Sequence, residues 1–203
     1  GASSANYPLS STSISGAIGT ITQATLMASL TGTVSKTYDG TTTAALSDAN
    51  YSLSGAISGD TVVLNNPTSG TYDNANTGTG KTVSVIGLAL SGTDSANYIL
   101  AATSISSAIG TITPKPLTTS LTYSVADATS TYGTLATLGA VTLTGVLTAD
   151  MGNISGVLSL YDSNSNAATL SATLKVGAYT EKVTSLSGSA ASNYVIADAG
   201  NTN

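Results

Sequence analysis

The sequence contains no cysteine, histidine, phenylalanine or tryptophan, and its five basic residues are all lysines. Without cysteine the chain forms no disulfide and offers no thiolate metal ligand. Without histidine it has no Ser–His–Asp or Cys–His nucleophile and no imidazole metal ligand. Asp39, Asp60 and Asp73 each adjoin a glycine or an asparagine, and Asp94 lies two residues after Gly92, in turn contexts where a carboxylate bonds its own backbone. The residue types therefore predict no catalytic residue, no cofactor and no enzyme activity.

Charge is scarce as well. Charged residues make up 7% of the chain and the net charge is -5, whereas ordinary soluble domains contain about 25% charged residues. Five lysines do not neutralise a run of phosphates, so we expect no nucleic-acid partner. No apolar run approaches the ~20 residues that a membrane helix needs, so we expect no membrane insertion. A cysteine-free, acidic chain rich in Ser, Thr, Gly and Asn is typical of large proteins exported by bacteria, which predicts an extracellular or cell-surface location.

A short box, Asn-Tyr after Ala or Ser, recurs along the chain at long and nearly regular intervals. Its copies are Asn6-Tyr7, Asn97-Tyr98 and Asn193-Tyr194. The hexapeptide AIGTIT, at residues 17–22, returns unchanged at 108–113. The interval is longer than the roughly 20–50 residues of solenoid repeats, so it indicates tandem domains.

The repeat fixes the expected boundaries. Residues 1–24 are the C-terminal strands of a preceding repeat, residues 25–113 a first complete repeat, and residues 117–203 a second repeat that lacks its last strand. Between the complete repeats, Pro114 and Pro116 restrict the backbone of 114–116, which predicts a short, stiff, Pro-rich junction.

Alternating apolar and polar residues with β-branched side chains recur in each unit, for example from Leu26 to Val34 and from Leu170 to Val176. This period of two residues is typical of half-buried strands. We therefore predict an all-β fold of tandem small antiparallel β modules, each a β-sandwich or a β-grasp-like sheet, in an elongated arrangement.

Four motifs of the first unit resemble the YDG repeat of large bacterial surface proteins: KTYDGT at 36–41, SGD at 58–60, GKTV at 80–83, and SG followed by NY within 91–98. Three motifs of the second unit resemble the related MBG repeat of the YGX type: TYG at 131–133, VGAY at 176–179 and NY at 193–194. Both repeats form tandem arrays in filamentous-haemagglutinin-like adhesins. The resemblance implies an extracellular, all-β stalk or filament, and it supplies no catalytic residues.

The recurring tyrosines and their neighbours are the candidate structural and assembly residues. A tyrosine ring is buried readily when its hydroxyl finds a partner, so we expect each to close a domain end and tie a loop; a stacking platform for sugars is the alternative. The set comprises Asn6, Tyr7, Ile18, Ile21, Tyr38, Asp39, Gly40, Asn97, Tyr98, Pro114, Pro116, Tyr132, Gly133, Asn193 and Tyr194.

One segment has the alternate-oxygen spacing of a calcium loop, with Asp162, Asn164 and Asn166 as weak metal candidates. Ala167 replaces the glycine of such loops, and Thr173 stands where a bidentate glutamate belongs. These departures favour a solvated turn over a weak calcium site.

The sequence thus favours a structural stalk or filament segment of a secreted adhesin, whose partners are neighbouring repeats or identical subunits. One version is strand donation, in which Ile14 to Thr22 forms a strand that completes the second unit of another subunit. In the plainer version the sequence is a window on a longer tandem array. The rival function is a carbohydrate- or protein-binding adhesin module, and the sequence names no receptor.

Overall fold

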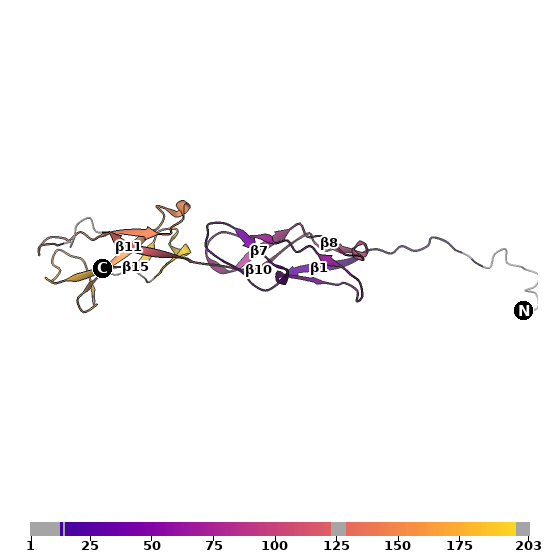
Figure 1. Ribbon diagram of the computed structural model, residues 1–203, viewed down its shortest axis with the longest axis horizontal. Coiled ribbons are helices and arrows are strands. Elements are labelled where there is room, and N and C mark those ends of the chain that lie inside the picture. The colour runs from indigo at the N-terminus through magenta and orange to yellow at the C-terminus, as the bar shows by residue number, and fades with distance from the viewer. Residues whose placement is uncertain (1–12, 14, 123–128, 198–203) are drawn as a thin grey trace, which may run out of the picture.

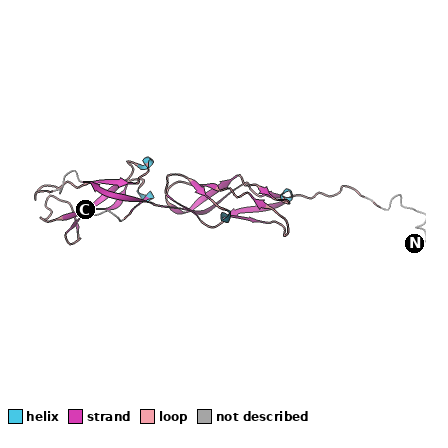
Figure 2. Ribbon diagram, in the orientation of Figure 1, coloured by secondary structure: helices cyan, strands magenta, loops and turns pink. Residues whose placement is uncertain are grey.

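The computed structural model describes residues 13, 15–122 and 129–197. Figure 1 shows two groups of strands placed end to end in an elongated molecule, with the described N-terminal segment extending from one end. The predicted all-β class is confirmed, since the helices of the described residues are 3-10 turns of three residues (Figure 2). We call residues 24–113 the first lobe and residues 115–197 the second lobe.

The first lobe contains three small sheets, with strand orders β4-β1-β9, β2-β10-β7-β6-β3 and β5-β8. Its strands are β1 Ala24–Leu30, β2 Val34–Thr37, β3 Thr43–Ala45, β4 Tyr51–Ser54, β5 Val63–Leu64, β6 Ser69–Tyr72, β7 Gly78–Ile86, β8 Leu90–Ser91, β9 Tyr98–Leu100 and β10 Ser104–Thr113. Short 3-10 turns at Asp48–Asn50 and Ser95–Asn97 precede β4 and β9.

The second lobe contains two sheets in its described part, with strand orders β12-β11-β16 and β14-β13-β15. Its strands are β11 Lys115–Thr122, β12 Ala140–Thr144, β13 Ser155–Asp162, β14 Ala167–Ala168, β15 Tyr179–Ser187 and β16 Tyr194–Ile196. The 3-10 turns Thr148–Asp150 and Ala191–Asn193 connect them.

The sheets are mixed, which corrects the prediction of purely antiparallel modules. Strands β1 and β9, β2 and β10, and β11 and β16 pair in parallel. In each lobe the strand that follows the Asn-Tyr box returns beside the lobe's opening strand. Such a pair joins segments far apart in sequence, so local turn signals do not reveal its direction.

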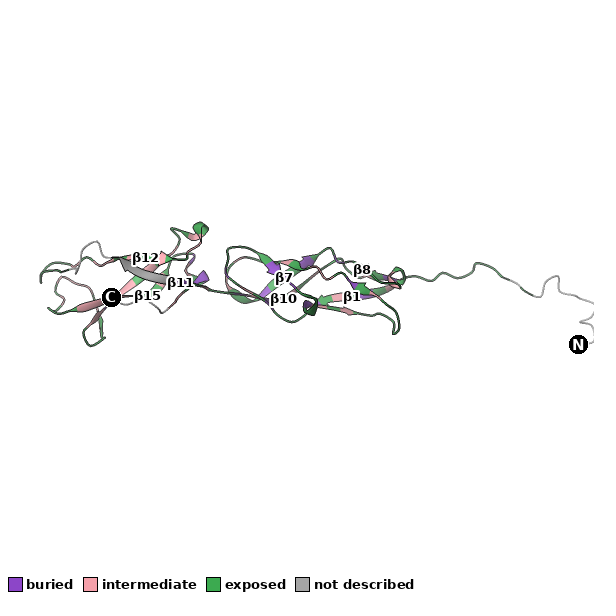
Figure 3. Cartoon of the chain, in the orientation of Figure 1, coloured by how far each residue is buried: buried purple, intermediate pink, exposed green. Residues whose placement is uncertain are grey.

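The core of the first lobe lies between its sheets, and Figure 3 shows buried residues along β7 and β10. On β7, Val83 and Val85 are buried and alternate with exposed residues, as expected for a strand with one covered face. Tyr72 is buried as well, and its hydroxyl donates to the carbonyl of Val34 at 3.0 Å. This bond offsets the cost of burying the hydroxyl group.

The predicted N-terminal strand is not formed in the described residues. Residues 15–23 are exposed and belong to no strand, and Ile18 and Ile21 are 99% and 100% exposed. Ile14 and the box Asn6-Tyr7 lie outside the described residues. A strand needs a neighbour for its backbone groups, and in β10 the same hexapeptide has β2 and β7 as neighbours.

The Pro-rich junction is shorter than the predicted range. Pro114 alone separates β10 from β11, because Lys115 and Pro116 already belong to β11. Lys115 and Pro116 lie opposite Tyr194 and Val195 of β16. The last strand of the first lobe therefore continues almost directly into the first strand of the second lobe.

Candidate functional site

The two lobes meet at a joint built around Tyr38, the tyrosine of the TYDG motif. Tyr38 directly follows β2, and its amide donates to the carbonyl of Thr113 at 2.9 Å. Its neighbour Asp39 closes the loop by accepting from the amide of Thr41 at 2.8 Å and from Lys36 Nζ at 2.7 Å. Burial raises the pKa of Asp39, but the hydrogen bonds from Lys36 and Thr41 outweigh it, so this pKa lies below its usual value. The loop therefore holds Tyr38 at the end of the lobe.

Asp150 of the second lobe receives the Tyr38 side chain. The Tyr38 hydroxyl donates to Asp150 Oδ2 at 2.9 Å, and the Tyr194 hydroxyl donates to the same oxygen at 2.6 Å. The amide of Leu147 donates to the Tyr194 hydroxyl at 3.0 Å. The two tyrosine rings meet edge to face with centroids 5.4 Å apart, a favoured aromatic geometry. One carboxylate thus holds a tyrosine from each lobe.

A second set of bonds crosses the joint at the Asn-Tyr box. The amide of Thr77, just before β7, donates to Asn193 Oδ1 at 3.0 Å. Asn193 Nδ2 donates to Asn76 Oδ1 at 3.3 Å, and Thr77 Oγ1 donates to the carbonyl of Ser192 at 2.9 Å. Asn193 is buried by these contacts. Both residues of this box therefore belong to the interface.

Gly40 lets the TYDG loop lie close to a side chain of the second lobe. It has φ +77, and a Cβ at this position would lie 3.2 Å from Leu147 Cδ1. The left-handed conformation suits glycine, and the missing side chain leaves room for Leu147. The TYDG loop therefore fits against the second lobe through its tyrosine and its glycine.

The joint keeps its tyrosines protonated. Burial, and then the hydrogen bond to Asp150, raise the pKa of Tyr194 to about 12. The same two causes raise the pKa of Tyr38. Both hydroxyls therefore remain donors to the carboxylate over the physiological range.

The first lobe repeats part of this arrangement at its other end. The Tyr98 hydroxyl donates to Asp60 Oδ2 at 2.5 Å, and the amide of Ile57 donates to the Tyr98 hydroxyl at 3.0 Å. Asn97, the other residue of this box, is exposed. Tyr98, Asp60 and Ile57 thus stand in the relationship of Tyr194, Asp150 and Leu147.

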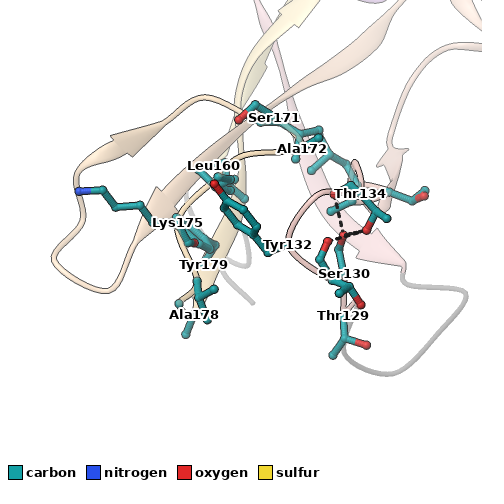
Figure 4. Close-up of a pocket in the computed structure, with 18 of the residues that line it drawn as sticks. Thr129, Ser130, Tyr132, Thr134, Leu160, Ser171, Ala172, Lys175, Ala178 and Tyr179 are labelled. Carbon is teal, nitrogen blue, oxygen red and sulfur yellow. Dashed lines mark hydrogen bonds between the residues drawn. The ribbon is translucent and has the colours of Figure 1, made fainter.

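Tyr132 and Gly133, the counterparts of Tyr38 and Gly40, lie at the far end of the second lobe. Tyr132 is 63% exposed, and Gly133 has φ +98. Tyr132 borders a cavity of about 830 Å³ that is also lined by Leu160 and Tyr179. Figure 4 shows these three side chains gathered at the pocket.

The calcium candidates form a hydrogen-bonded turn. Asp162 Oδ1 accepts from the amides of Asn164 and Asn166 at 2.9 and 2.8 Å, and Asp162 Oδ2 accepts from Asn166 Nδ2 at 3.1 Å. The backbone bond from Asn166 is the largest cause that lowers the pKa of Asp162. Within the described ranges, no three His, Cys, Asp or Glu residues group as a metal site would require. A weak calcium site here stays a prediction.

Sequence reasoning singled out both tyrosines of the joint but not Asp150, which links them, nor Asn76 and Thr77. A signal for Asp150 was present, because LSGAISGD at 53–60 aligns with LTGVLTAD at 143–150. Both octapeptides end in the aspartate that accepts the tyrosine hydroxyl. An aspartate in such a turn usually accepts hydrogen bonds from its own backbone. From the sequence alone there was therefore no reason to expect it to accept a tyrosine hydroxyl.

No helix in the described part of the chain has the length and apolar character needed to cross a bilayer. No curated protein and no solved structure matches the chain. The family model of the YDG domain matches residues 22–105, a range that runs from just before β1 into β10. This match supports the assignment of the first lobe to the YDG domain family.

Proposed function

We propose that this chain is a structural segment of an extracellular stalk or filament in a large secreted bacterial adhesin, whose modules dock end to end. The joint between the lobes carries the proposal. It combines a shared carboxylate, an edge-to-face tyrosine pair and backbone-to-side-chain bonds. Several such contacts acting together fix the orientation of one module on the next.

Strand donation is the proposed means of assembly. The AIGTIT sequence of residues 108–113 ends β10, where Ile112 is 1% exposed between β2 and β7. The identical sequence at 17–22 is fully exposed, and it leads into β1 as β10 leads into β11. An exposed copy of a core strand is suited to complete a neighbouring module.

The second lobe supplies a matching acceptor. Its described part contains no counterpart of β10 beside β15, although β15, which pairs antiparallel with β13 as β7 does with β6, likewise precedes an Asn-Tyr box. The cavity beside Tyr179, the first residue of β15, is also lined by Leu160, Leu170 and Leu174. In our scheme Ile21 of one subunit fills this cavity in the next.

Two charge substitutions test this assembly. Ile21→Asp places a carboxylate where Ile112 is buried, and Thr22→Asp places the same charge where Thr113 is exposed. We expect the wild type and Thr22→Asp to form head-to-tail polymers in sedimentation and electron microscopy, and Ile21→Asp to remain monomeric. A wild-type chain that stays monomeric at high concentration contradicts donation between subunits.

The cavity also favours a second candidate function, a carbohydrate-binding module. Tyr132 and Tyr179 offer aromatic faces, and the cavity is within the size range of small-ligand sites. A glycan array tests this candidate, with Tyr132→Ala as the matched variant. Binding by the wild type that is lost in Tyr132→Ala supports it, and the absence of any bound glycan contradicts it.

A further inference from the structure

We propose that Ile57, Asp60 and Tyr98 form a docking face for the Tyr132–Gly133 loop of a second copy of this chain. The inference rests on the proposed end-to-end assembly and identifies the surface through which it takes place. We call this surface the N-terminal docking face.

The docking face repeats the receiving half of the joint atom for atom. At the joint, Asp150 Oδ2 accepts two hydroxyls, one from Tyr194 of its own lobe and one from Tyr38 of the other lobe. Asp60 Oδ2 accepts the hydroxyl of Tyr98, which corresponds to the bond within the lobe. A carboxylate oxygen accepts more than one hydrogen bond, so Asp60 retains the capacity that Asp150 uses for Tyr38.

The receiving surface at the joint and its repeat in the first lobe differ in how exposed they are. Ile57 is 64% exposed. Its counterpart Leu147 is partly buried, and a Cβ at Gly40 of the other lobe would lie 3.2 Å from its Cδ1. Asp60 is exposed, whereas Asp150 is partly buried. At the joint, the equivalent leucine and aspartate are covered by the other lobe. We therefore expect a partner to cover Ile57 and Asp60 in the same way.

The loop at Tyr132 has the features that this occupant needs. Tyr38 is 7% exposed where it is docked, and Tyr132 is 63% exposed. Hydrogen bonds within the loop hold its shape, since Thr134 Oγ1 and the Thr134 amide donate to the carbonyl of Thr131 at 2.6 and 2.9 Å (Figure 4 shows the loop). Gly133 keeps the left-handed conformation of Gly40. The loop also lacks the aspartate of TYDG, so it brings no second carboxylate next to Asp60.

A two-copy chain tests the face directly, because the sequence has no cysteine of its own. Two copies of the whole sequence are joined in one polypeptide, with Thr131→Cys in the first copy and Ser58→Cys in the second. A short bis-maleimide then reports whether the loop and the face meet, and mass spectrometry maps the cross-link. Thr37→Cys with Thr148→Cys in a single copy is the matched control, since these exposed residues flank the joint that the structure shows.

We expect a cross-linking yield within about twofold of that control, because both pairs are held together inside one chain. Ile57→Asp in the second copy or Tyr132→Phe in the first copy should lower the yield several-fold, while leaving the Thr37–Thr148 control unchanged. The reversed arrangement, with Ser58→Cys in the first copy and Thr131→Cys in the second, places the thiols at the two outer ends of an end-to-end pair and should not cross-link.

A yield no higher than that of the reversed arrangement overturns the docking face. A yield that neither Ile57→Asp nor Tyr132→Phe changes also overturns it. Random collisions between two flexibly linked copies would give such a yield, because they do not depend on these side chains. The linked copies report on the face even if separate chains do not polymerise. Failure of strand donation and failure of the docking face are therefore distinguishable.

Discussion

Tyr38 donates its hydroxyl to Asp150 across the joint at 2.9 Å, although the two residues are 112 positions apart in the sequence. This bond joins the loop after β2 of the first lobe to the 3-10 turn Thr148–Asp150 of the second lobe. Because Tyr194 donates to the same oxygen, a change at Asp150 or at either tyrosine acts on both lobes.

Tyr38→Phe removes the hydroxyl and keeps the ring that packs on Tyr194. Loss of a hydrogen bond to a charged acceptor costs about 1.5–3 kcal/mol. We expect the amides of Thr77 and Leu147, both bonded at the joint, to exchange with solvent roughly 10- to 150-fold faster, because about 1.4 kcal/mol corresponds to a factor of ten. Tyr132→Phe, at an exposed tyrosine, is the control and should leave both rates unchanged. Equal rates in wild type and Tyr38→Phe contradict a linking role for this bond.

Alkaline pH should weaken the joint. The pKa of Tyr194 is raised to about 12 from 10.0, so the folded chain holds a proton that the unfolded chain loses earlier. The stability that this group contributes is complete below pH 10 and is lost as the pH rises towards 12. We expect Tm to fall over this interval, and to fall less steeply in the double variant Tyr38→Phe/Tyr194→Phe. Parallel curves for the two proteins contradict the assignment.

Gly40→Ala and Gly59→Ala separate backbone strain from contact between the lobes. Both glycines have positive φ, +77 and +104, and a Cβ meets Leu147 only at Gly40. Strain in this region costs about 1–2 kcal/mol for an ordinary residue. Denaturant titration should show a larger loss for Gly40→Ala than for Gly59→Ala. Adding Leu147→Ala should recover part of the difference, and additive effects would show that the two residues do not interact.

Gly110→Ala tests the close approach of β10 to the core. A Cβ at Gly110 would lie 2.6 Å from Tyr72 Cε1 and 2.8 Å from the Lys81 carbonyl oxygen. Overpacking of this kind costs about 1–3 kcal/mol, so unfolding should begin at lower denaturant. Gly19→Ala changes the same hexapeptide where nothing lies within 4 Å, and it should leave the stability of the monomer unchanged.

The internal repeat explains how much of this arrangement the sequence predicted. Alternation from Leu26 indicated a strand with a buried face, which β1 forms, and the two lobes follow the spacing of the Asn-Tyr boxes. The same alternation from Leu170 to Val176 forms no strand, and these residues lie between β14 and β15. The parallel pairing of β1 with β9 was not predictable from local pattern, because its partners are joined by most of the lobe. The extended but unpaired segment 15–23 shows the same limit, since its residues favour a strand and only a neighbour completes one.

The joint was harder to predict than the strands. Tyr38 and Tyr194 were expected to close domain ends, but one sequence does not show that a single oxygen of Asp150 accepts both hydroxyls. That fact depends on how β10 continues into β11 and so on how the lobes are aligned. The similar octapeptides at 53–60 and 143–150 show that Asp60 and Asp150 occupy equivalent turns, but not that Asp150 binds both tyrosines.

The near-continuous path of β10 and β11 through Pro114 has a mechanical consequence. A tensile force applied to the two ends of the molecule runs along this path, parallel to the strand axes. The bonds that β10 makes with β2 and β7 are then loaded together in shear, whereas a force across the strands would peel them apart one at a time. Under stretching, the joint should yield before either lobe is pulled open.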